Sequence, residues 1–539
     1  MLTAQFLRRA TVSLGRRGWG GHVRGRREGR VAVLRNGNEF GCDCHCGSFG
    51  QQHHQVRMSH YGHDISRIVD RCMTVYLNTT SSLFTTEKLK SLAISSIKKD
   101  LLPGEDHDAS VILVSKSLAS WLEDSSFMAQ LVQLVWSVTP DKTPAKSFSV
   151  LTAAVDEVPP PPQARENWKA STVGLSILRG SASRMLPGLW EAGAGSQQKL
   201  DQPAFLDFRV PGLQSASQPL HVTLPLAHTI FSNGKPYTFT ASRWQTTAGA
   251  FRNEVSLVGS VEKTTQTIVL PSHHSSLQMR TALVPLTKPH KIIAGLGNIL
   301  RQVEVGARLE PASKELESVI PALLNRRLKH SDPAQGGQAS GAVGVWALII
   351  PKEVANISSY PLPSALDVEC YDPEKVGNLA QQTSDVMEGL LSQGCQLRKI
   401  LSGGGGWGLK QGLLSLDPQT KFTAEEHEDL ESFMRSFRGE EDTGGIVTPG
   451  TYVQFFTELH PAETRDRPVL RTLTEALRYV IGTSGTSTRA MGDNVIAQTY
   501  PNLFGAVSSE GIYLSSEGSA LRTKLDAPRS FVVSREDHL

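Results

Sequence analysis

Residues 109–114 read ASVILV, and residues 148–155 read FSVLTAAV. Both segments are short, mostly apolar runs in which β-branched residues are frequent, as in strands that are buried on both faces of a sheet. Between them, residues 126–135 carry apolar residues at helical spacing and predict a helix. A strand, a helix and a second strand in this order favour a layered α/β unit whose sheet is at least partly parallel.

The alternation of strands and helices continues on both sides of this unit. Residues 73–77 are strand-like, residues 85–101 have approximately helical spacing, and residues 172–178 predict a further strand. Residues 159–162 are consecutive prolines, which cannot continue a hydrogen-bonded ladder and therefore end the preceding strand. We expect a sheet with flanking helices in this part of the chain.

The middle of the chain is rich in strand patterns. Residues 229–231 and 237–240 flank Asn233-Gly234, a pair that favours the tight turn of a β-hairpin because it tolerates positive φ angles. Three further segments have the composition of strands: 253–259, 266–270 and 278–285. A β-rich section is therefore expected after the first sheet.

The rest of the chain again mixes helices and strands. Residues 329–341, KHSDPAQGGQASG, bury almost nothing and predict a flexible loop. This loop divides the chain into an expected domain 65–328 and an expected C-terminal domain 342–539. The predicted fold class is α/β (α+β mixed), with a layered sheet and flanking helices, a β-rich middle section and a second mixed α/β C-terminal part.

The first 35 residues differ from the rest. They contain nine arginines and one acidic residue, Glu28, and near the start Leu2, Phe6, Leu7 and Leu14 can share one face of a helix. An Arg-rich, Ser-containing and acid-poor start is typical of a mitochondrial presequence. We expect residues 1–35 to direct the chain to the mitochondrial matrix. The alternative is a basic arm that binds nucleic acid.

Residues 36–64 have neither a helical nor a strand period. Cys42, Cys44 and Cys46, with histidines nearby, suggest a zinc site. Three thiols this close together do not match the spacing of paired zinc ligands, so we expect no metal there. The segment is expected to be either disordered or the product of an erroneous gene model.

Composition excludes several classes of protein. Lys and Arg number 55 against 52 Asp and Glu, so the net charge of +3 gives no general attraction to nucleic acid. The longest apolar run, residues 342–350, is too short for a membrane-spanning helix. Six cysteines in 539 residues do not form a disulfide scaffold. We expect a soluble protein without a membrane span or a nucleic-acid partner.

The most distinctive motif is SGGGGWGLKQG, residues 402–412. Successive glycines can direct backbone N–H groups into a concavity that binds phosphate or carboxylate. The spacing is not that of a P-loop, in which lysine directly follows the second glycine. The alternative is a glycine loop that only permits a tight turn. The candidate ligand- or anion-binding residues are Ser402, Gly403, Gly404, Gly405, Gly406, Trp407 and Lys410.

No catalytic constellation can be read from the sequence. Residues 295–300 lack the third glycine of a dinucleotide-binding motif. Residues 425–431 lack the second histidine of a metalloprotease helix, and residues 482–485 place a glycine one position too early for a nucleophile elbow. We therefore expect no catalytic residue, no cofactor and no metal.

The order of elements from Met73 to Leu178 resembles the N-terminal part of a FIST (F-box and intracellular signal transduction) domain. The resemblance covers about a fifth of the chain and includes the strand at 109–114, which ends in Ser115-Lys-Ser117. Asp156 stands where the family's small-residue turn has glycine. The resemblance implies an α/β sensory module for small ligands such as amino acids, and it carries over no binding residue.

Together, these patterns predict a mitochondrial, soluble, non-catalytic protein that senses a ligand or binds protein partners through a FIST-like module. One alternative is an enzyme of unknown class whose 402–410 loop binds a phosphate or a nucleotide. A second alternative is an organelle RNA-binding or ribosome-associated factor. A bound nucleotide would favour the first alternative, and bound nucleic acid the second.

Overall fold

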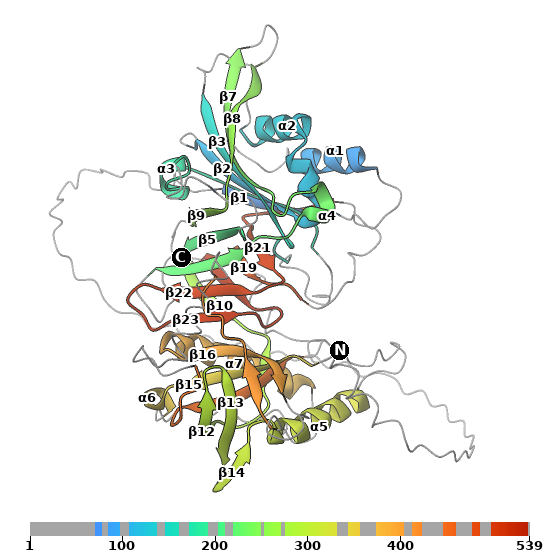
Figure 1. Ribbon diagram of the computed structural model, residues 1–539. Helices are drawn as coiled ribbons and strands as arrows, with labels where there is room; N and C mark the ends of the chain where they lie inside the picture. The colour runs from blue at the N-terminus through green and yellow to red at the C-terminus, as the bar shows by residue number, and fades with distance from the viewer. Residues whose placement is uncertain are drawn as a thin grey trace, which may run out of the picture. The chain divides into compact units, whose positions relative to one another are not determined.

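The computed structural model places most of the chain between Arg71 and Glu536 (Figure 1). The described residues are 71–77, 85–97, 107–136, 146–160, 172–191, 203–210, 219–248, 253–270, 275–330, 343–355, 373–403, 412–422, 446–459, 477–485 and 497–536. The expectations for residues 1–35 and 36–64 lie outside them. Within the described ranges, no helix is both long enough and apolar enough to cross a lipid bilayer.

The described residues form helices and four sheets, which confirms the mixed α/β class. The first sheet has seven strands in the order β20-β1-β4-β2-β3-β7-β8. Its strands are β1 (Arg71–Leu77), β2 (Ala109–Ser115), β3 (Ser147–Val155), β4 (Gly174–Gly180), β7 (Phe239–Ala248), β8 (Asn253–Glu262) and β20 (Ala497–Pro501). Within it, β2 and β3 are parallel and all other neighbours are antiparallel.

Helices cover one face of this sheet (Figure 1). They are α1 (Thr86–Ile97), the 3₁₀ helix η3 (Lys116–Leu122) and α2 (Ser125–Val135). Asp124 caps α2, because its carboxylate accepts the backbone N–H groups of Ser126 and Phe127. In β2, Ile112 packs towards these helices, whereas Val111 belongs to the core on the opposite face. Burial on both faces explains why the strand is apolar at almost every position.

Two smaller sheets share the core on that opposite face. One has the order β23-β22-β6-β5-β9, and the other the order β10-β24-β19-β21. The strands of the five-stranded sheet are β5 (Phe205–Val210), β6 (Leu220–Pro225), β9 (Thr265–Val269), β22 (Ile512–Ser516) and β23 (Arg522–Leu525). Those of the four-stranded sheet are β10 (Ser275–Arg280), β19 (Leu477–Thr483), β21 (Phe504–Ser508) and β24 (Phe531–Glu536).

The remaining sheet contains a closed ring of 6 strands, in the order β18-β12-β13-β17-β16-β15 and back to β18. These strands are β12 (His290–Leu296), β13 (Ile299–Val305), β15 (Val345–Ile350), β16 (Gln396–Gly403), β17 (Leu414–Leu416) and β18 (Tyr452–Glu458). Two short strands outside the ring, β11 (Leu283–Pro285) and β14 (Arg308–Pro311), pair with β18 and β13. The helices α5 (Lys314–His330) and α7 (Pro373–Ser392) pack against the same core.

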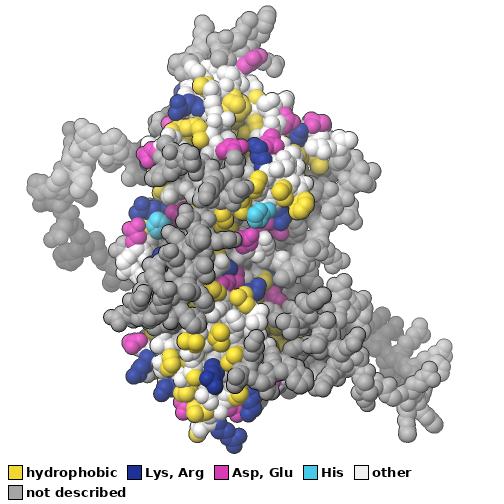
Figure 2. Space-filling view, viewed as in Figure 1, with side chains coloured by type: hydrophobic (Ala, Val, Ile, Leu, Met, Phe, Trp, Pro, Cys, Tyr) yellow, Lys and Arg dark blue, Asp and Glu magenta, His cyan; other side chains and the backbone are white. Residues whose placement is uncertain are grey.

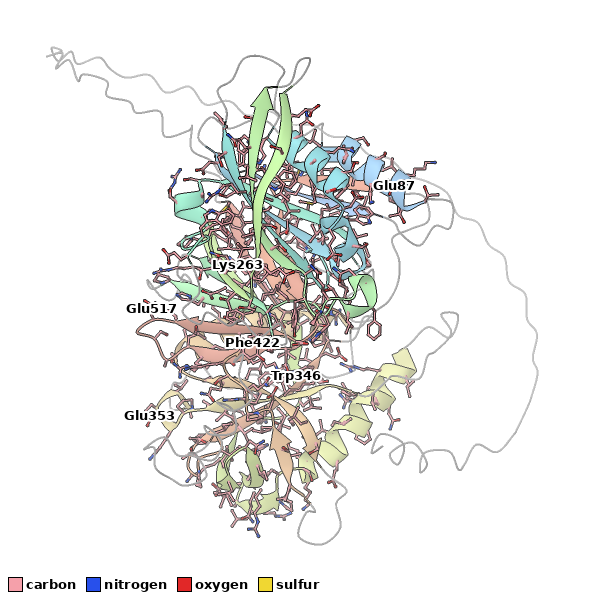
Figure 3. All side chains as sticks on the ribbon, turned by 45° about the horizontal axis from the view of Figure 1, so that its top comes forward. Glu87, Lys263, Trp346, Glu353, Phe422 and Glu517 are labelled. Atoms are coloured by element: carbon pink, nitrogen blue, oxygen red, sulfur yellow. The ribbon has the colours of Figure 1, made fainter. Side chains whose placement is uncertain are left out.

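The sheets do not divide at residues 329–341. Each of the four sheets pairs strands from before this segment with strands from after it. The six-stranded ring is also joined to the five-stranded sheet by side chains, among them Phe422 and Trp346 (Figure 3). Phe422 packs edge-on against Phe205 and Tyr513, and the Trp346 indole N–H donates to Asp526 at 2.7 Å. The two expected domains, 65–328 and 342–539, therefore share their sheets.

The expected hairpin at 229–240 is wrong. Residues Ile230–Asn233 form a one-turn helix, α4, which ends at Gly234 with φ of 81°. Gly234 does have the positive φ angle that a hairpin turn would need, but side-chain hydrogen bonds stabilise a helical turn in place of the hairpin. The Thr229 hydroxyl bonds with the Lys235 carbonyl and the Thr238 hydroxyl, which draws the two ends together around a helical turn.

Candidate functional site

The parallel strands β2 and β3 end side by side, and each is followed by a charged residue. Ser115 of β2 pairs with Val155 of β3, so Lys116 and Asp156 come next at the same edge. The Lys116 ammonium donates to Asp156 Oδ1 at 2.7 Å. The carboxyl ends of parallel strands are the usual place of ligand sites in open α/β sheets. The sheet topology thus creates a charged pair where a ligand site is expected.

Asp156 is a buried carboxylate with donors on both oxygens. Its Oδ2 accepts the backbone N–H and the hydroxyl of Ser509, each at 2.8 Å. Ser509 directly follows β21 and lies 353 residues further along the chain. Burial of an unpaired carboxylate is unfavourable, and charge-assisted hydrogen bonds offset that cost. Asp156 is therefore held in place and connects Lys116 to a distant part of the sequence.

The neighbouring Glu157 has a different environment. Burial raises the pKa of Glu157, the nearby Asp156 charge adds to the rise, and hydrogen bonds from Thr172 oppose it. Both the backbone N–H and the hydroxyl of Thr172 donate to its carboxylate at 3.2 Å. The backbone of Glu157 also pairs with Val507, near the end of β21. This pairing brings the end of β3 against the segment that carries Ser509.

The segment between β6 and β7 is hydrogen-bonded to the residue that follows β2. The Ser232 hydroxyl donates to the Lys116 carbonyl at 2.8 Å, which fixes this segment beside the end of β2. The Tyr237 hydroxyl and His228 Nε2 are hydrogen-bonded at 3.2 Å. Burial raises the pKa of Tyr237, and the charge of Glu510 adds to the rise.

These contacts bring together side chains from four separate segments. We call this set the β2–β3 end site: Lys116, Asp156, His228, Tyr237, Ser509 and Glu510. Half of the Lys116 side chain is exposed, at 50%, and the bond to Asp156 needs one of its three ammonium protons. Among the described residues, the set supplies an ammonium, a phenol, an imidazole and a hydroxyl from segments that the Ser232–Lys116 and Ser509–Asp156 hydrogen bonds connect. This combination can hold a small polar molecule by hydrogen bonds.

A second buried polar cluster joins the six-stranded ring to the five-stranded sheet. The Lys524 ammonium donates to Asp417 at 2.9 Å, and the Tyr513 hydroxyl donates to Gln419 at 2.9 Å. Burial raises the pKa of Tyr513 to about 12 and lowers the pKa of Arg398 to about 10. Arg398 donates to three successive carbonyls, those of residues 417–419. Because these groups bond one another across two sheets, we interpret the cluster as a structural joint.

Of the candidate residues in the glycine run, the structure describes Ser402 and Gly403. They are the last residues of β16 and pair with Ser415 and Leu414 of β17. A Cβ atom at Gly403 would lie 2.3 Å from the Leu414 side chain, so glycine permits close approach of these strands. The other candidates are outside the described residues, and the anion site stays a prediction: Gly404, Gly405, Gly406, Trp407 and Lys410.

The glycine run and the β2–β3 end site belong to different sheets. Ser402 lies in the six-stranded ring, whereas Lys116 and Asp156 follow strands of the seven-stranded sheet. Of the end-site residues, Lys116 and Asp156 have a sequence signal, because each follows an apolar strand. No local pattern connects Ser509 or Tyr237 to them. In the part of the chain that the structure describes, no three His, Cys, Asp or Glu side chains are grouped to hold a metal ion.

Comparison with known proteins found no family model, no curated protein and no solved structure that matches this chain. The interpretation of the site therefore rests on the arrangement of its own residues. Two features of that arrangement matter most. The buried Asp156 carboxylate orients an exposed lysine, and the same carboxylate holds the loop that follows β21.

Proposed function

We propose that this chain is a non-catalytic protein that senses a small polar ligand at the β2–β3 end site. The observation that carries the proposal is the double role of Asp156, which holds Lys116 through one oxygen and Ser509 through the other. A ligand bound to the Lys116 ammonium would contact both the end of β2 and the loop after β21. Binding would therefore change the relative stability of segments that are distant in sequence, as a sensor requires.

The fixed state of Asp156 favours binding over acid–base chemistry. A general base must be able to accept a proton from the substrate. Both oxygens of Asp156 already accept hydrogen bonds from Lys116 and Ser509. In this proposal Asp156 positions the lysine, and the ligand meets Lys116, His228 and Tyr237.

We assign the sensory role to a FIST-like module. What supports this is the order of elements from β1 to β4, with α1 and α2 between the strands. The resemblance implies small ligands such as amino acids, which carry the carboxylate and amine that these polar groups can bond. In the proposed function, the ligand-bound module signals to a protein partner.

A thermal-shift experiment on the full chain tests the ligand site. The probes are the twenty amino acids, with ATP, GTP and inorganic phosphate in parallel. A ligand present at about 100 times its Kd should stabilise the wild type by about 2.7 kcal/mol. The rise in Tm should be lost in Lys116→Ala and kept in Lys291→Ala, which removes an exposed lysine of β12. Equal stabilisation of both variants would contradict the proposal.

We further propose import into the mitochondrial matrix. The support is the composition of residues 1–35, with nine arginines and one acidic residue. A fluorescent reporter fused to these residues should enter mitochondria and lose them by cleavage. The same fusion with Arg8, Arg9, Arg16 and Arg17 changed to Gln should stay outside. A diffuse or nuclear wild-type reporter with an intact N-terminus would overturn this part of the proposal.

A further inference from the structure

The one-turn helix α4 presents two neighbouring apolar side chains to solvent. Phe231 is fully exposed, at 103%, and Ile230 is 52% exposed. Hydrophobic side chains are visible at the surface over α4 in Figure 2. Neither side chain belongs to a core cluster of the described residues. The fold therefore gives no packing reason for an aromatic ring at this position.

The turn that carries these side chains is fixed by hydrogen bonds. The N–H groups of Ser232 and Asn233 both donate to the Thr229 carbonyl. The Asn233 side chain donates to the Thr238 hydroxyl at 2.8 Å. Ser232 is bonded to the Lys116 carbonyl, which ties the turn to η3. A turn that is ordered before binding loses little conformational entropy when a partner docks.

A cluster of three charged side chains with a net negative charge lies beside the apolar turn. The Lys235 ammonium is shared between Glu123 at 3.1 Å and Glu262 at 3.0 Å. Hydrogen bonds from Lys235 to Glu262 and Glu123 raise the pKa of the lysine, so it remains charged. Two carboxylates around one ammonium leave a net negative charge. All three side chains are at least 36% exposed, so a partner can reach them.

We infer that Ile230 and Phe231, with the Glu123–Lys235–Glu262 triad, form a docking surface for another protein. The partner that fits is one with an apolar socket for the Phe231 ring beside a lysine or arginine. Aromatic side chains are common anchors at the centres of interfaces, and complementary charges at the rim direct association. The inference goes beyond the proposed ligand site, because it concerns a different ligand class and different side chains.

The charge argues against two other occupants. A second copy of this chain that docked through the same face would bring one acidic triad close to another, and like charges across an interface are unfavourable. An anionic membrane surface would repel the same carboxylates. Both remain distinguishable outcomes of the experiment below.

A site-specific cross-linker tests the surface in the full chain, expressed in the cells that make it. The variant Phe231→p-benzoylphenylalanine should form one discrete cross-linked product with another protein. The captured peptide, identified by mass spectrometry, should contain apolar residues next to lysine or arginine. Capture should fall at least tenfold when Glu123→Lys and Glu262→Lys are added. It should persist with Glu353→Lys and Glu517→Lys, which change the net charge equally elsewhere (Figure 3).

A purified partner gives the second measurement. Phe231→Ala should weaken its binding at least tenfold while leaving the Tm of the free chain unchanged, because the ring is fully exposed. The ligand-induced Tm rise should also be unchanged, which separates this surface from the β2–β3 end site. A self-cross-link, recovery only with lipid, no discrete product, or capture that ignores the charge reversal would overturn the inference.

Discussion

At the scale of single residues, the buried carboxylate of Asp156 depends on the donors around it. Asp156→Ala removes the acceptor for Lys116 and Ser509 and should lower the free energy of unfolding by about 1.5–3 kcal/mol. Ser509→Ala alone removes one of these bonds. Because both changes act on the same contact, the double variant should lose at least ~0.5 kcal/mol less than the sum of the two single losses.

Urea denaturation of the wild type, Asp156→Ala, Ser509→Ala and the double variant measures this coupling. All four must be compared under one set of conditions, because the midpoint reports the whole cooperative unit. Additive losses within about 0.3 kcal/mol would mean that Asp156 and Ser509 do not interact in solution.

The stability of the chain should depend on pH through Glu157. Burial raises the pKa of Glu157, so the folded chain binds this proton more tightly than the unfolded chain. Its contribution to stability is therefore fully present below the ordinary glutamate pKa of about 4.3 and is lost as the pH rises through the raised value. Glu157→Gln keeps an oxygen acceptor for Thr172 and removes the titration.

The Tm of Glu157→Gln should exceed that of the wild type at pH 7.5, and the difference should disappear near pH 4. Thermal unfolding followed by circular dichroism at several pH values measures it. A difference that is constant across this range would show that the pKa of Glu157 is not raised.

At the scale of elements, substitution by alanine should destabilise the chain at one strand glycine and have almost no effect at another. A Cβ atom at Gly505 of β21 would lie 1.8 Å from the Val480 carbonyl oxygen, whereas one at Gly259 of β8 would meet nothing within 4 Å. Gly505→Ala should therefore destabilise the chain by at least ~3 kcal/mol or prevent folding. Gly259→Ala should leave the Tm nearly unchanged. Similar Tm values for the two variants would contradict the close packing of β19 and β21.

Two segments, 109–114 and 229–240, show when a local sequence pattern is sufficient to predict an element and when it is not. The apolar run at 109–114 is confirmed as β2 because burial on both faces leaves a signal at every position. The pattern at 229–240 misled because Asn233-Gly234 specifies positive φ without specifying a hairpin. The helical turn is instead stabilised by the hydrogen bond between the Thr229 and Thr238 hydroxyl groups, which lie nine residues apart.

At the scale of the whole molecule, we expect the polar cluster between the six-stranded ring and the five-stranded sheet to contribute to stability. Lys524 and Asp417 are 13% and 10% exposed and bond at 2.9 Å. Lys524→Met would remove the ammonium that bonds the Asp417 carboxylate and should cost about 3 kcal/mol. The double variant Lys524→Met/Asp417→Leu should recover part of that loss. Calorimetry measures both, and an unchanged Tm in Lys524→Met would show that the joint does not hold these sheets.

Long-range pairing also limits what the sequence could predict of the site. Lys116 and Asp156 lie directly after strands that are readable locally, so their shared edge follows once β2 and β3 are known to be parallel. Ser509 reaches Asp156 from 353 residues away, through a sheet whose strands come from both halves of the chain. No pattern of spacing contains that information. For the same reason, the loop at 329–341 suggested a boundary that the strand pairing does not follow.

The central claim is that the β2–β3 end site binds a small molecule. Native mass spectrometry of the full chain, purified from the cells that make it, tests this most directly. The wild type should carry one small polar molecule, Lys116→Ala should lose it, and Lys291→Ala should keep it. A wild-type chain that carries no small molecule and gains none of the offered ligands would contradict the claim, as would Lys116→Ala retaining the same molecule.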